Sequence, residues 1–136
     1  MSVIRRSDAR RSETPNAEMT TFASPTQGSA TLAMWQVDMR AGTQGPLHAM
    51  DAEQIWTFLD GSAAVELAGE KHELATGDTL VLPADTARRI TTAEGFTAVV
   101  ASTSPSRAYN PDAITPEGAC DMAPRDAERV LPAWIA

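Results

Sequence analysis

Four side chains near the middle of the sequence could carry the chemistry of a small-molecule site: His48, Met50, Gln54 and Arg88. An imidazole has an unperturbed pKa of about 6.5, so His48 can take up or release a proton near neutral pH. The planar guanidinium of Arg88 can bind a carboxylate or a phosphate. The amide of Gln54 can position a substrate or a water molecule. These residue types favour proton transfer on an anionic molecule.

Each of these side chains also has a purely structural explanation. His48 can be a core histidine whose ring is hydrogen-bonded to Gln54 or to a backbone carbonyl. Arg88 can point outward, or it can lie inside the fold. Because burying an unpaired guanidinium costs several kcal/mol, an inward Arg88 needs either an internal carboxylate or a bound anion. The carboxylates nearest to it in the sequence are Asp51, Glu53 and Asp85.

The elements that position these residues are short apolar segments separated by turn residues, a spacing typical of antiparallel β-strands. Residues two apart in a strand share a face, so His48 and Met50 point the same way. Along the first long segment the residues of one face are Trp35, Val37 and Met39. No convincing amphipathic helix and no internal repeat interrupts the pattern. The sequence therefore predicts an all-β fold with strands over residues 32–39, 54–59, 64–67, 71–74, 79–82, 88–91 and 96–103.

The spacing of glycine, proline and histidine selects one kind of barrel among those that such strands can form. Glycine at strand ends allows positive backbone dihedral angles, and proline ends a strand where no ladder donor is needed. The framework over residues 42–92 resembles the two motifs of the cupin superfamily, and the resemblance implies a single jelly-roll β-barrel. It consists of Gly42, His48, Met50, Gln54, Gly61, Gly77, Pro83, Asp85, Arg88 and Thr92.

The resemblance also implies a metal site that this sequence has largely lost. In the family, two histidines and a glutamate of the first motif and a histidine of the second bind a divalent metal. Here His48 keeps the first position, and Met50, Gln54 and Arg88 occupy the others. A guanidinium accepts no coordination bond, and its charge repels a divalent ion. We therefore expect no tightly bound metal. If a metal is bound, its expected ligands are His48 and Gln54. The other histidine, His72, is expected to be solvated.

If the family register holds, Gln54 and Arg88 converge with His48 inside the barrel, whereas Arg89 points outward. The expected catalytic residues are His48 and Gln54, and Arg88 is expected to bind the substrate. Five apolar residues are expected to form the pocket wall and the core, with an indole that can stack on a planar substrate. They are Met34, Met39, Met50, Trp56 and Phe58.

Composition divides the chain into one domain and two arms. A chain of 136 residues is large enough for one hydrophobic core. Residues 1–20 are mostly polar or charged and are expected to form a mobile arm, and residues 21–106 are expected to form the barrel. Residues 107–136 are expected to form an irregular arm that packs on the barrel or on a partner subunit. Its apolar end consists of Leu131, Trp134 and Ile135.

Charge and cysteine content limit the possible partners and compartments. The net charge is −7, and residues 12–136 hold seventeen acidic and seven basic side chains. Such a body repels a phosphate backbone, which argues against nucleic acid as a partner. No apolar run approaches the roughly 20 residues of a membrane span, and no secretory signal is expected. The single cysteine, Cys120, fits a reducing compartment, so we expect a cytoplasmic protein. Exposed sheet edges and the resemblance to cupins predict a homodimer.

The main functional hypothesis is a small-molecule enzyme that performs isomerisation, cyclisation or elimination on an anionic or enolisable substrate without a tightly bound metal. The metal-free sugar-nucleotide epimerases of the superfamily are similar in using a barrel histidine as base, but this chain is shorter than they are and lacks their other motifs, so their reaction is not assigned to it. One alternative is a non-catalytic module that binds a small ligand in the same cavity. The other is a metal-dependent oxygenase or lyase with His48, Gln54 and water as an unusual ligand set.

Overall fold

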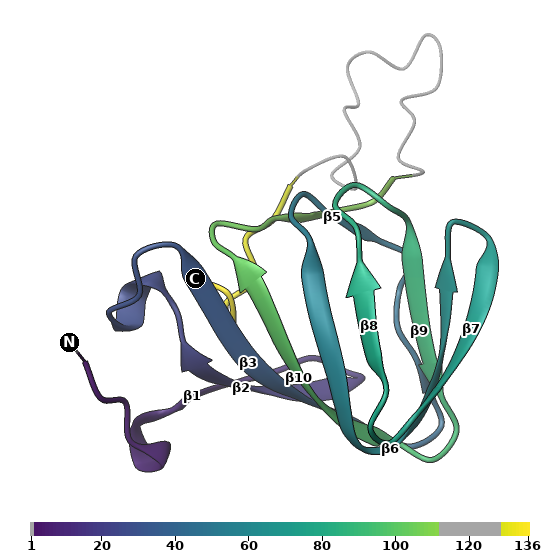
Figure 1. The fold of residues 1–136 in the computed structure, drawn as a ribbon, viewed down its shortest axis with the longest axis horizontal. Coiled ribbons are helices and arrows are strands. Elements are labelled where there is room, and N and C mark those ends of the chain that lie inside the picture. The colour runs from purple at the N-terminus through teal and green to yellow at the C-terminus, as the bar shows by residue number, and fades with distance from the viewer. Residues whose placement is uncertain (1, 112–128) are drawn as a thin grey trace, which may run out of the picture.

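Strands make up most of the chain. The computed structural model describes residues 2–111 and 129–136, and Figure 1 shows a curled antiparallel sheet whose two halves enclose the core. The prediction of an all-β fold is confirmed.

The strands are β1 (Arg10–Glu13), β2 (Ala17–Ala23), β3 (Leu32–Met39), β4 (Thr43–Gln44), β5 (Ala49–Met50), β6 (Gln54–Leu67), β7 (Glu70–Ala75), β8 (Thr79–Leu82), β9 (Arg88–Thr92), β10 (Phe96–Thr103) and β11 (Ala108–Tyr109). Among the described residues, the helices are two short 3-10 turns, η1 (Arg6–Asp8) and η2 (Pro25–Gln27), and no helix could cross a membrane.

Strand β6 connects the two halves of the sheet. Its residues 54–61 pair with β10, and 54–57 of these also pair with β8, whereas residues 62–67 pair with β7 and, in part, with β9. At the bend Gly61 has a φ of 80°. A Cβ there would collide with the backbone of Gly95, so glycine is required. The bend lets a residue of β9, Arg88, reach Gln54 at the start of β6.

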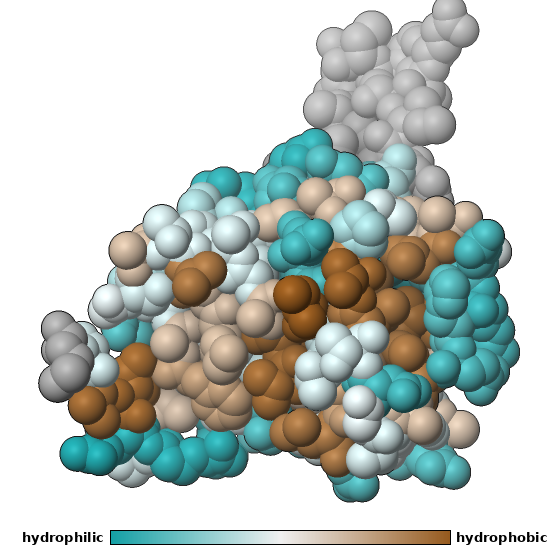
Figure 2. Space-filling view, in the orientation of Figure 1, coloured by the Kyte–Doolittle hydropathy of each residue, from teal (hydrophilic) through white to brown (hydrophobic). Residues whose placement is uncertain are grey.

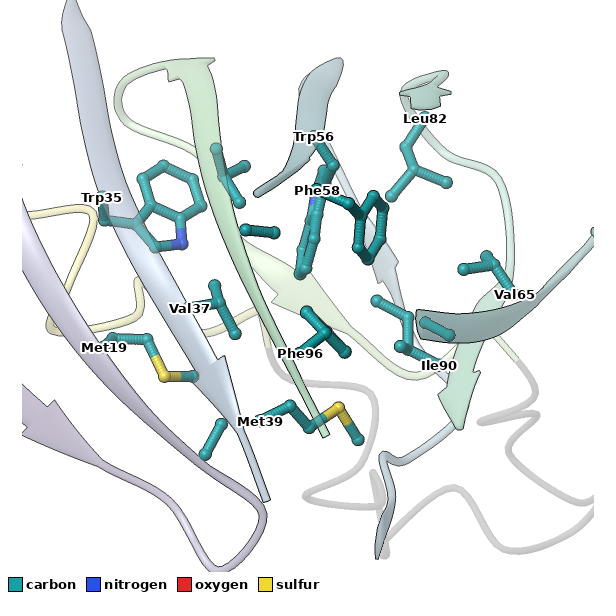
Figure 3. Close-up of a cluster of buried hydrophobic side chains, with 14 of the residues drawn as sticks. Met19, Trp35, Val37, Met39, Trp56, Phe58, Val65, Leu82, Ile90 and Phe96 are labelled. Atoms are coloured by element: carbon teal, nitrogen blue, oxygen red, sulfur yellow. The ribbon is translucent and has the colours of Figure 1, made fainter. Parts of the chain in front are cut away.

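The core between the sheet halves is rich in aromatic and sulfur-containing side chains (Figure 3). The residues of β3 that face it are, as the alternation predicted, Trp35, Val37 and Met39. Trp56 and Phe58 of β6 and Phe96 of β10 form a cluster with ring centroids 5.0 to 6.4 Å apart. Aromatic pairs of this kind contribute about 0.5–1.5 kcal/mol beyond their area burial. The cluster therefore fixes the inner face of the first part of β6.

The N-terminal region is more ordered than the sequence suggested. Residues 1–20 were expected to form a mobile arm, whereas the structure has β1 and β2 in the sheet, with β2 paired to β3. Ala17 and Met19 are buried against the core. Glu18 between them points outward and pairs with Arg11 at 3.0 Å. The alternation around Ala17 and Met19 was too short to mark a strand in the sequence, but pairing with β3 satisfies the backbone donors and acceptors of this segment.

The described part of the C-terminal region lies against the barrel of its own chain. Val130 forms a backbone bridge with Ala108. The Thr21 hydroxyl donates to the Trp134 carbonyl at 2.9 Å, and Ile135 is fully buried. Leu131 and Trp134 pack against the core. The rest of the predicted arm, including Cys120, lies outside the described residues.

Candidate functional site

A largely apolar cavity of about 650 Å³ lies inside the barrel. Its wall is formed by residues of β2, β3, β5, β6, β9, β10 and β11, together with residues 14–16, 45, 46, 48 and 130–135. The volume suits a small organic molecule, because ligand pockets commonly measure about 300–1,000 Å³. Among the described residues that line it, His48 is the only one with a titratable side chain. Any acid–base chemistry on a ligand in this cavity would therefore start from His48.

The position of His48 is fixed by the backbone. Its N–H donates to the Arg88 carbonyl at 3.0 Å, and the Arg88 N–H donates to the His48 carbonyl at 2.8 Å. This pair of bonds joins the loop before β5 to the start of β9. The separation of the imidazole from the Arg88 side chain is thus set by main-chain pairing.

The ring of His48 is held in one tautomer. Its Nδ1 lies 2.9 Å from the carbonyl oxygen of Pro46. A carbonyl can only accept, so in the neutral ring Nδ1 carries the proton and Nε2 keeps a free lone pair. Burial lowers the pKa of His48; the bond to Pro46 opposes this effect, and the positive charge of Arg88 adds to it. The imidazole is therefore neutral at pH 7 and can act as a base through Nε2.

The amide of Gln54 is also held in one orientation. Its Oε1 accepts from the indole Nε1 of Trp56 at 3.0 Å and from Nη1 of Arg88 at 3.0 Å. Both partners are donors only, so the oxygen must face them. Gln54 lines the cavity, and its amide nitrogen is the end that can donate to a ligand.

Arg88 is a buried cation without a carboxylate partner among the described residues. Its side chain is 1% exposed, and Nε and Nη2 have no hydrogen-bond partner in the described part of the chain. Burial lowers its pKa to about 10, so it remains charged at neutral pH. The carboxylates proposed from the sequence are engaged elsewhere or exposed: Asp51 pairs with Arg129, Asp85 accepts from the Tyr109 hydroxyl, and Glu53 is exposed.

The structure brings most of the expected site residues to the cavity. Its lining includes His48, Gln54, Met39, Met50 and Trp56. Arg88 and Phe58 are buried beside it but do not belong to the lining, because Arg88 lies behind Gln54 and Phe58 packs into the aromatic cluster. The prediction for Met34 is wrong, since it is 45% exposed on the outer face of β3.

Sequence reasoning missed part of the cavity wall. Trp35 lines the cavity, although its inward position followed from the alternation of β3. Residues 130–135 and Asn16 also line it. The apolar end of the chain was the one sequence feature that pointed to this wall. Its partner surface could not be identified without the fold.

The donor set of this cavity does not fit a catalytic divalent metal. No group of three or more His, Cys, Asp or Glu residues that could hold a metal occurs in the described part of the chain. The lone pairs of Gln54 Oε1 face two donors, Met50 offers only a weak thioether, and Arg88 is cationic. Among the described residues, His48 Nε2 is left as the one strong ligand. A divalent transition metal typically takes three or four protein ligands.

Restoring the family's ligands is expected to create a metal site. We predict that the triple variant Met50→His, Gln54→Glu and Arg88→His binds close to one equivalent of zinc or manganese, because it replaces the cation and supplies four donors. The parent chain is predicted to bind well below one equivalent. Metal analysis after dialysis measures both. A folded triple variant without metal would contradict the inward convergence of these positions.

Comparisons with known proteins agree with this architecture. The family model for the cupin domain matches residues 35–103. Among solved structures, KdgF from Halomonas sp. is similar with a TM-score of 0.65 at 23% identity, over 76% of this chain and 93% of that one. An RmlC-like cupin from Shewanella frigidimarina gives 0.65 at 14%, over 74% and 88%. DMSP lyase DddQ from Ruegeria pomeroyi gives 0.65 at 23%, over 73% and 58%. No curated protein matches the sequence.

Proposed function

The chain belongs to the cupin family, and on this premise we propose that it is an enzyme that moves a proton on a small anionic or enolisable molecule. The reaction class is isomerisation, cyclisation or elimination, without a tightly bound metal. The observation that carries the proposal is a neutral His48, with Nε2 free, in the lining of a largely apolar cavity beside a buried cation.

His48 is the proposed base. Its Nε2 takes a proton from the bound substrate, and the ring becomes an imidazolium. The Pro46 carbonyl, 2.9 Å from Nδ1, stabilises that charged form. The same ring can then return the proton to another atom of the substrate or to a leaving group. Acid–base catalysis of this kind contributes about 10²–10⁴-fold to a rate.

Gln54 and Arg88 are proposed to stabilise the negative charge that proton removal creates. The Gln54 amide nitrogen donates to the substrate oxygen that gains charge. Arg88 Nη1 binds the oxygen of the same amide at 3.0 Å and thereby strengthens its donor end. Because Arg88 does not line the cavity, it acts through Gln54 and through its charge rather than by direct contact. It is therefore a positioning residue.

The apolar wall supports the same reaction. Met39, Met50 and Trp56 line the cavity and surround a bound molecule with apolar surface. In such surroundings the interaction between a developing anion and the Arg88 charge is stronger than in water. One similar structure, DddQ, is a DMSP lyase, and elimination belongs to the proposed class. At 23% identity that likeness bears on the fold alone.

A non-catalytic ligand-binding module is the second candidate. It is favoured by the fact that His48 is the only titratable side chain among the described lining residues. A carrier or sensor would need the apolar wall and the Gln54 donor but no proton transfer. The metal-dependent oxygenase or lyase is not retained as a candidate, because the donor set does not fit the metal.

Proton exchange in heavy water separates the two candidates. The chain is incubated in D₂O with a panel of small 2-oxo and 3-oxo acids, and proton NMR follows the C–H beside the carbonyl. We predict that at least one acid loses this signal faster with the chain than without it, because His48 exchanges the proton it removes with solvent. An acid that binds, as shown by saturation-transfer NMR, but does not exchange would favour the binding module.

We further propose that the chain works as a homodimer in the cytoplasm. The single cysteine and the acidic body support that compartment. The apolar residues at the end of the chain were expected to need cover from a partner, but Leu131, Trp134 and Ile135 pack on their own barrel. These residues therefore do not depend on a partner subunit for cover.

A further inference from the structure

The outer face of four neighbouring strands, β3, β10, β6 and β8, carries a continuous apolar row. Ala101 of β10 pairs with Met34 on one side and with Ile55 on the other, and Ile55 pairs with Val81 of β8. Met34, Ile55 and Val81 are 45%, 43% and 50% exposed. Figure 2 shows apolar side chains gathered over these strands. We call this surface, with Leu32, Leu59 and Val99, the apolar face.

The apolar face is unlike the solvent side of most antiparallel sheets, on which polar residues alternate with the buried ones. The row next to it holds Gln36, Val99, Thr57 and Thr79, none of them charged. In this half of the sheet, the charged residues that these strands place on the outer side, Asp38 and Asp60, lie together at one end. Asp38 there accepts hydrogen bonds from Gln36 and Thr97. The centre of the face is therefore uncharged.

This lack of charge favours a second copy of the chain as the occupant. The chain carries a net charge of −7, so two copies repel each other over most orientations. Contact through the uncharged face keeps their acidic residues apart and removes apolar area from water. Two copies related by a two-fold axis would stack sheet on sheet, with the strands aligned to within about 30°.

The size of the apolar face is sufficient for such a contact. The strands β3, β10 and the first part of β6 each contribute eight residues to this half of the sheet, and β8 contributes four. At about 3.3 Å per residue and about 4.8 Å between strands, these residues cover a flat area of about 440 Å². Side chains that project from the sheet make the accessible area larger than this flat area. A specific interface should bury at least about 1,000 Å² in total, or about 500 Å² on each partner. We infer that the apolar face is the dimer interface of this protein. This inference rests on the proposed homodimer and is independent of the proposed reaction.

Light scattering during size-exclusion chromatography at about 20 μM tests the interface. The parent chain should show twice the chain mass of 14.5 kDa. Ile55→Glu and Met34→Glu should each give the monomer mass, because they bury a like charge in both copies. Val3→Glu adds the same charge at another exposed apolar residue and should stay dimeric. Near-ultraviolet circular dichroism checks that each variant is folded.

The outcomes separate the dimer from its interface. A monomeric parent chain would overturn both the homodimer and the apolar face as its interface. A dimeric parent with folded, dimeric Ile55→Glu and Met34→Glu variants would overturn the interface alone. Mixing Ile55→Glu with Ile55→Lys should restore a dimer, since opposite charges then meet across the contact. The interface would also be overturned if the mixture of Ile55→Glu and Ile55→Lys stays monomeric and the Val3→Glu variant is monomeric too. Dissociation would then follow from the added net charge and not from its place on the apolar face.

Discussion

The His48→Gln variant is expected to lose about 10²–10⁴-fold in kcat/KM on any substrate that the chain turns over, the range typical of a removed acid–base group. Glutamine keeps a polar side chain of similar reach but cannot accept a proton near neutral pH. His72→Gln is the matched control, because His72 is the other histidine and lies exposed on β7. Steady-state kinetics of the three chains measure the effect. Equal losses in both variants would contradict the assignment of His48 as the base.

The pH profile of the parent chain follows from the direction of the His48 shift. Burial and the Arg88 charge lower the pKa of His48 from its ordinary 6.5. The neutral, active form therefore persists below that pH, and kcat/KM should fall only as the pH drops through the lowered pKa. The acid limb should lie below pH 6.5 and should vanish with His48→Gln. A limb at or above this value would show that His48 is not the titrating base.

Replacing Arg88 with methionine is expected to stabilise the fold while impairing ligand binding. Methionine fills a similar volume without a charge, and replacing buried ionic groups with apolar ones often stabilises by about 1–4 kcal/mol. The variant also removes the positive charge beside the cavity, so the affinity for an anionic ligand should fall by about 2 kcal/mol, or roughly 30-fold, the interaction of two unit charges about 8 Å apart at an effective dielectric of about 20. Urea unfolding and titration calorimetry measure the two quantities.

Arg89→Met is the control for this variant. Arg89 follows Arg88 on β9 and faces the other side of the strand, where it is less buried. The control should change neither the free energy of unfolding nor that of ligand binding by more than about 0.5 kcal/mol, as is usual for surface substitutions. Arg88→Met should also move the acid limb of the pH profile upward, because it removes a charge that lowers the His48 pKa. A destabilised Arg88→Met variant with unchanged ligand affinity would make Arg88 a structural residue.

The features that the sequence predicted depend on local pattern. Alternation along β3 placed Trp35 and Met39 inward, because side chains two apart share a face wherever the strand lies. The glycine framework identified the family and, with it, the register that points Arg88 inward. Gly61 shows why glycine spacing can identify a fold, since the bend in β6 tolerates no other residue type.

The features that the sequence did not predict depend on contacts between distant segments. Strand β2 forms on the edge that β3 offers, and the short, polar strand β1 in turn pairs with β2. The two donors on Gln54 come from residues 2 and 34 positions away, and their convergence is visible only in the folded chain. The sequence also could not show that Arg88 lacks a carboxylate partner among the described residues. Three acidic residues lie close to it in the sequence, but two of them bind other residues and the third is exposed.

The cavity wall contains residues from both ends of the sequence, and this has a consequence for folding during translation. Thr21 on β2 is hydrogen-bonded to Trp134, 113 positions later, and both segments enclose the cavity. Pairing across such a span raises the contact order, and folds dominated by distant pairings form in milliseconds to seconds rather than microseconds. A nascent chain can assemble β3, β6 and β10 earlier, but the cavity closes only after residue 135 has left the ribosome. Ligand affinity should consequently appear only once residues 130–135 have packed against β2 and β3.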